Sequence, residues 1–137
     1  MKLSETVQEV IRLGTASRAY WDRELPKSHP HYPVLRPGEP EVPPPGEEAQ
    51  IRSLLKGLPE PQVYTLVLLA HLGRREFTAD RLPTAYDNMK EAFPTKDIAI
   101  AEMAENANVG EDLTDALEEL TQRRIDLDTL SFANGAP

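Results

Sequence analysis

Residues 63–72 restrict the fold more than any other segment, because apolar side chains fall on nearly every side of the helix that they predict. The apolar members are Val63, Tyr64, Leu66, Val67, Leu68, Leu69, Ala70 and Leu72. A helix without a polar face belongs in the middle of a helical bundle. The sequence therefore predicts an all-α fold in which this helix is the centre.

The residues that follow this apolar run predict a helix end. Gly73 is suited to the left-handed turn that ends many helices, and Arg74 and Arg75 place positive charge at the negative end of the helix dipole. His71 falls in the last turn, where an imidazole can also satisfy the final carbonyls. We interpret His71 as a partly buried structural histidine.

The rest of the chain predicts a single-domain bundle of about six helices, since helical spacing of apolar residues recurs and no alternating strand pattern of convincing length is found. The expected parts are an N-terminal helix over 1–25, a proline-rich loop over 26–46, a helical core domain over 47–132 and a frayed tail over 133–137. The loop holds eight of the thirteen prolines. Proline lacks the amide proton that helices and sheets need, so we expect an extended, polyproline-like or mobile crossover after the first helix.

The apolar stripe of the first helix includes Val10 and Trp21 and passes through two small residues, Gly14 and Ser17. Small residues at these positions would let another helix approach closely. That helix is either another segment of this chain or a second copy, and the second alternative predicts a homodimer. Trp21 fits a core or loop-packing role better than a partner anchor.

The formal net charge of -8 is unevenly distributed, since residues 94–137 contain ten acidic and three basic groups. This charge repels phosphate backbones, so we expect no nucleic-acid binding. We interpret the acidic third as a solvated surface, with capture of a basic protein as the sharper alternative. The chain has no cysteine, which excludes disulfides, thiolate zinc sites and cysteine nucleophiles. Without an apolar stretch long enough for a membrane span or a signal peptide, we expect a cytoplasmic protein.

Three histidines, one tyrosine and two arginines are the candidate contacts for a ligand or partner. His29 and His31 flank a proline, and a proline-rich loop does not fix the direction of their rings, so we predict no metal site. Nucleophile elbows, phosphate loops and dinucleotide fingerprints are absent, so we predict no cofactor and assign no catalytic residue. The candidate contacts are His29, His31, Tyr32, His71, Arg74 and Arg75.

A short block in the middle of the chain resembles a known family. The pattern is Leu66-x-x-Leu69-x-x-Leu72-Gly73-Arg74 followed by Phe77, and it is preceded by Ile51-x-x-x-Leu55-x-Gly57-Leu58. It is similar to the central block of a family of small bacterial proteins that is known as a domain of unknown function, over residues 50–93 and more loosely over 94–122. The resemblance implies a helical fold and a bacterial origin, and it transfers no mechanism.

Two functional hypotheses follow from these observations. The first is a non-enzymatic interaction or regulatory module that self-associates through Val10, Gly14, Ser17 and Trp21. The alternative is a small enzyme or ligand-binding domain with a site between the 29–35 loop and the 71–80 helix junction. The alternative requires His29, His31, His71 and Arg74 to converge in space.

Overall fold

The computed structural model describes residues 2–34 and 36–130, so the predicted frayed tail over 133–137 lies outside the described residues. The described residues form helices and no strand, which confirms the all-α prediction. The elements are α1 (Leu3–Ser28), α2 (Gly46–Lys56), α3 (Glu60–Gly73), the 3-10 turn η1 (Ala79–Arg81), α4 (Leu82–Ala92), α5 (Lys96–Ala104), α6 (Val109–Gln122) and the 3-10 turn η2 (Leu127–Thr129). None of these helices is long and apolar enough to cross a bilayer.

Helix α3 is the centre of the bundle, as its apolar faces predict. It packs against α4, α5 and α6, and residues 63–70 together with Leu72 are at most 3% exposed. Its two buried hydroxyls are satisfied, since Thr65 donates to the carbonyl of Pro61 at 2.7 Å and Tyr64 donates to the carbonyl of Phe93 at 2.5 Å. Burial raises the pKa of the Tyr64 phenol. The core is thus closed without an unpaired hydroxyl on this helix.

The predicted role of Gly73 as a left-handed stop is wrong. Gly73 is the last residue of α3 and is buried, while the left-handed conformation falls two residues later, on Arg75 with a φ of 62°. The reason for the glycine is close packing, because a Cβ built on it would lie 1.8 Å from the backbone oxygen of Asp112 in α6. Glycine is therefore needed here for the approach of two helix backbones.

Helix α1 is longer than the prediction that ended it at residue 25. It continues through Pro26 to Ser28, and the amide of His29 closes the last turn on the carbonyl of Leu25 at 2.8 Å. Proline costs one helical hydrogen bond near this end, but its φ is compatible with a helix. The crossover therefore spans 29–45 in place of the predicted 26–46, and the core begins one residue earlier than predicted, at Gly46.

The small-residue notch of α1 is occupied within the chain. Val10, Gly14 and Ser17 are buried, and a Cβ on Gly14 would lie 2.5 Å from Cγ1 of Val109 in α6. The crossing is tight on the other side as well, since a Cβ on Gly110 would lie 2.8 Å from the hydroxyl of Thr15. The partner of the notch is thus α6 of the same chain, which corrects the prediction that these residues form a self-association surface.

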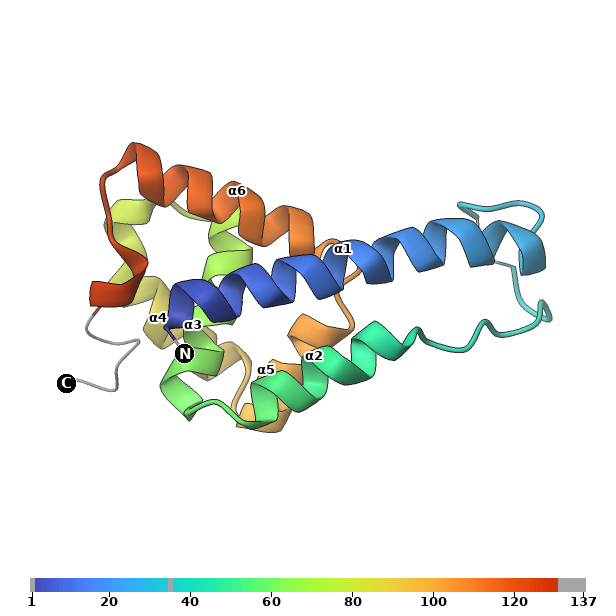
Figure 1. Ribbon diagram of the computed structural model, residues 1–137, viewed down its shortest axis with the longest axis horizontal. Coiled ribbons are helices and arrows are strands. Elements are labelled where there is room, and N and C mark those ends of the chain that lie inside the picture. Colours follow the sequence, from blue (N-terminus) through green and yellow to red (C-terminus); the bar gives the residue numbers. More distant parts are fainter. Residues whose placement is uncertain (1, 35, 131–137) are drawn as a thin grey trace.

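The far part of α1 extends beyond the helices that cover its first half (Figure 1). Ser17 is the last buried residue of α1, and residues 18–28 are all exposed or half-buried. The crossover 29–45 continues from this end of the molecule and returns to α2 (Figure 1). We call residues 18–45 the arm.

We expect Gly73→Ala to lower the free energy of unfolding by about 3 kcal/mol, because the added methyl group must push two backbones apart. Gly46→Ala is the matched control, since its Cβ would meet nothing within 4 Å at the start of α2. Urea denaturation measures both variants, and the control should stay within about 0.5 kcal/mol of the wild type. Equal stabilities for the two variants would contradict the close-packing role of Gly73.

Candidate functional site

A charged cluster surrounds His71, the one residue between 63 and 73 that is not fully buried. Nδ1 of His71 lies 2.6 Å from Oε2 of Glu76, and Nε2 lies 3.6 Å from Oε1 of Glu102. Both ring nitrogens are shielded from solvent, yet neither of them forms a hydrogen bond. The ring also lies beside Phe93, with 5.9 Å between the ring centres. The prediction of a partly buried histidine at the end of α3 is confirmed.

Arg74 connects this cluster to α6. Its Nε donates to Oδ2 of Asp112 at 2.8 Å, and the same oxygen accepts from the side-chain amide of Asn106 at 3.0 Å. Asp112 is only 8% exposed and lies in the first turn of α6, where the helix dipole also favours a carboxylate. Arg74 therefore compensates a buried negative charge at the contact of α3 with α6.

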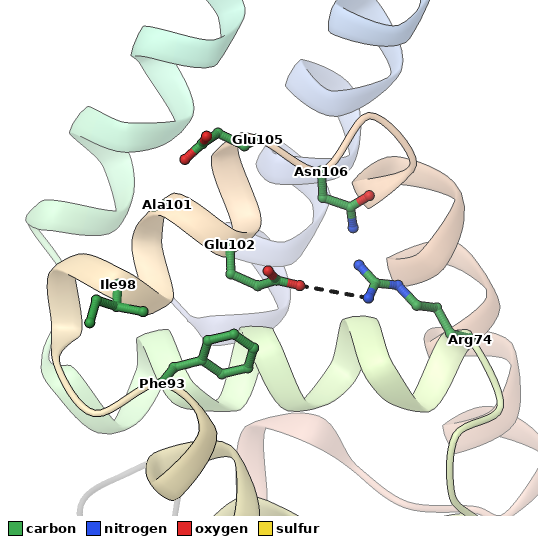
Figure 2. Close-up of a pocket in the computed structure, with 7 residues that line it drawn as sticks. All are labelled: Arg74, Phe93, Ile98, Ala101, Glu102, Glu105 and Asn106. Carbon is green, nitrogen blue, oxygen red and sulfur yellow. Dashed lines mark ion pairs between the residues drawn. The ribbon is translucent and has the colours of Figure 1, made fainter. Parts of the chain in front are cut away.

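A shallow hollow of about 430 Å³ opens beside this arginine. Figure 2 shows Arg74 reaching toward Glu102, with Asn106 beside it and Phe93 below α5. Nη1 of Arg74 lies 3.6 Å from Oε1 of Glu102. The remaining lining residues are Ile98, Ala101 and Glu105.

The charged groups of this cluster contact one another within the chain, and its carboxylates outnumber its one arginine. Arg74 faces three carboxylates, those of Glu76, Glu102 and Asp112, so its guanidinium is already engaged. His71 is not among the residues that line the hollow. Within 2–34 and 36–130, no group of three His, Asp or Glu residues is arranged to hold a metal ion. The arrangement is that of an internal ion-pair network that fixes the end of α3.

The arm is the second candidate, and a set of polar contacts fixes its crossover. Nδ1 of His29 lies 2.9 Å from Oε1 of Glu39, and the backbone amide of Arg36 donates to the same oxygen at 2.7 Å. These two hydrogen bonds, that of His29 first, hold the pKa of Glu39 below its usual value. Glu39 thus favours this conformation above the ordinary pKa of a glutamate, and the contribution is lost as the pH falls through the lowered value.

Aromatic side chains connect the two parts of the arm, which are the end of α1 and the crossover. The hydroxyl of Tyr20 donates to the carbonyl of Pro43 at 2.5 Å, and that of Tyr32 donates to Oδ1 of Asp22 at 3.3 Å. The ring of Trp21 packs edge-on against that of Tyr20, with 5.3 Å between centres. Tyr20, Trp21 and Tyr32 are half-buried, and the hydroxyls of the two tyrosines connect α1 with the crossover.

A groove of about 460 Å³ lies where the arm meets the body of the protein. Its apolar part comes from Trp21, Leu25, Tyr32, Pro44 and Ala107. Its charged rim comes from Arg18, Asp22, Glu48 and Glu105. Three carboxylates face one arginine on this rim, so the groove is mildly acidic.

The structure brings together only part of the predicted contact set. His71 and Arg74 share the cluster at the end of α3, whereas Arg75 is exposed and its side chain forms no hydrogen bond or ion pair among the described residues. His29, His31 and Tyr32 lie on the crossover, at the far end of the long axis from α3 (Figure 1). The convergence required by a site between the 29–35 loop and the 71–80 junction is therefore not found.

Comparison with family models, with curated proteins and with solved structures found no match. The geometry alone therefore distinguishes the two candidate sites. The cation of the charged cluster, Arg74, is already engaged by carboxylates of the same chain. The arm instead presents aromatic and proline surface to solvent.

Three carboxylates that pair with predicted contact residues were not predicted from the sequence: Glu39, Glu102 and Asp112. Glu102 lies 31 residues from its partner His71, and Asp112 lies 38 residues from Arg74. No local sequence pattern predicts pairs at these separations. Glu39 is nearer to His29, but no regular element connects the two and no spacing rule applies. The one available signal was the position of Asp112 at the start of a helix.

We expect Arg74→Ala to lower the free energy of unfolding by about 2 kcal/mol, because it leaves the buried Asp112 with Asn106 as its remaining partner. Arg75→Ala removes the same charge one residue later, from an exposed side chain, and should change stability by less than about 0.5 kcal/mol. Urea denaturation at low and high salt compares the two variants. An equal loss in both would show that net charge, and not the contact with Asp112, is what matters.

We expect Glu39→Ala to loosen the crossover, because His29 and the amide of Arg36 both lose their acceptor. Hydrogen–deuterium exchange at the backbone amide of Arg36, which donates to Glu39, should then become several-fold faster at neutral pH. Glu41→Ala, also on the crossover and without a hydrogen bond or ion pair among the described residues, should leave this exchange at the wild-type rate. Unchanged exchange of the Arg36 amide in Glu39→Ala would contradict the anchoring role.

Proposed function

We propose that the chain is a non-enzymatic interaction module that contacts another protein through the arm of residues 18–45. The observation that carries the proposal is the extension of the described part of the arm, residues 18–34 and 36–45, beyond the helical body (Figure 1). Ordering a backbone costs about 1–2 kcal/mol per residue, and the arm buries little apolar surface in return. Such an extension is most simply explained by a contact outside the chain.

The side chains of the arm support a protein as the partner. Trp and Tyr are enriched at protein interfaces because they bury a large area while losing few rotamers. Trp21 and Tyr32 line the groove and are only half-buried. Val34, on the crossover, is 59% exposed and is the most exposed large apolar residue of the described chain.

The charge of the chain favours a basic partner over nucleic acid. The net charge is -8, and Glu111, Asp115 and Glu118 are exposed on α6 without an ion pair among the described residues. An acidic surface attracts a basic protein and repels phosphate. We further propose a cytoplasmic protein of bacterial origin, on the absence of cysteine and on the resemblance described above.

A photo-crosslinker tests this proposal in living cells of the source organism. We introduce p-benzoylphenylalanine at Val34 on the arm and, as the control, at the exposed Asn88 on α4. We expect an adduct of one discrete mass from position 34 and only background from position 88. No adduct at position 34, or equal adducts at both positions, would overturn the proposal. An adduct of twice the mass of the chain would identify the partner as a second copy.

A further inference from the structure

Residues 40–45, Pro-Glu-Val-Pro-Pro-Pro, are held in one extended conformation by their own covalent geometry. Each proline fixes its φ near about −65°. Each residue before a proline is also restricted to extended conformations, which applies to Val42, Pro43 and Pro44. Pro45 has φ −70° and ψ 157°, close to the polyproline II values of about −75° and +145°. Glu41 is neither a proline nor followed by one, so it is the residue of the segment whose backbone dihedral angles these restrictions do not limit.

The exposure of the segment follows the three-residue turn of a polyproline II helix. Val42 is half-buried and Pro45 is buried, so this row faces the protein. Pro40 and Pro43 form a second row and Glu41 and Pro44 a third, and all four are exposed. Two of the three faces of the helix are therefore presented to solvent.

Two hydrogen bonds, one from α1 and one from α2, hold this segment in place. The hydroxyl of Tyr20 donates to the carbonyl of Pro43, and the amide of Glu48 donates to the carbonyl of Pro45 at 3.1 Å. Among the described residues, no backbone group pairs with the amides of Glu41 and Val42. The backbone is thus fixed by two contacts while its outer face stays available.

We propose that residues 40–45 are a polyproline II ligand for a partner with an aromatic-lined groove and a cationic rim. Aromatic grooves take prolines spaced three residues apart, and a preformed helix loses little entropy on binding. The spacing of Pro40 and Pro43 fits such a groove. Glu41 lies between them in sequence, is exposed and has no ion pair among the described residues, so it is placed to meet a cation of the partner.

This inference rests on the proposed function, because it names the partner class for the same arm. The binding test uses the full-length chain and a panel of purified polyproline-binding domains whose grooves are aromatic, some with cationic and some with anionic rims. We expect binding to the cationic members only. The double variant Pro40→Ala/Pro43→Ala should weaken this binding by about tenfold or more.

Two variants are matched controls for the double variant. Pro37→Ala removes an exposed proline of the same crossover that lies in the preceding turn, outside the segment, and should bind like the wild type. Glu41→Lys should transfer the preference toward anionic rims. Circular dichroism and the melting temperature should be the same in all variants, since these residues are exposed.

The two proposals fail in different ways. The polyproline inference is overturned when no member of the panel binds, or when the double variant binds like Pro37→Ala. If the crosslink from position 34 still forms in full yield in the double variant, the arm contacts a partner but not through residues 40–45. If no crosslink forms at position 34 in the wild-type background, the proposed function itself is overturned.

Discussion

The bundle depends on the close packing of α6 against two other helices, α3 and α1. On one side, Gly73 lets the backbone of α3 reach that of Asp112, where a Cβ would lie 1.8 Å from an oxygen. On the other side, Gly14 and Gly110 let α1 cross α6 at a similarly short separation. Closely packed backbones leave no space for larger side chains, so each of these positions is set by sterics.

This contact also explains why the charged cluster sits where it does. The approach at Gly73 brings Asp112 into a buried position, and a buried carboxylate requires a partner. Arg74, the next residue along the chain, supplies it at 2.8 Å. The packing of α3 on α6 and the pairing of Arg74 with Asp112 are therefore two parts of one contact.

The central helix was predictable because its pattern leaves one solution, whereas the roles of single residues depended on distant parts of the chain. An apolar helix at 63–72 must be enclosed, and its burial follows directly from that pattern. A glycine near a helix end fits both a left-handed turn and a close approach, and only the position of α6 decides between them for Gly73. For the same reason the notch at Gly14 was visible in the sequence but its partner was not.

The passage of α1 through Pro26 without a break has a mechanical consequence. One continuous helix belongs to both the packed body and the arm, so the arm has no hinge between Ser17 and Ser28. The fourteen residues that follow Gly14, where α1 crosses α6, up to Ser28 rise about 21 Å. A rotation of about 10° at this crossing would therefore move the far end by about 4 Å. A force applied to the far end of α1 would therefore act on the packing of α1 against α6 at Gly14 and Gly110.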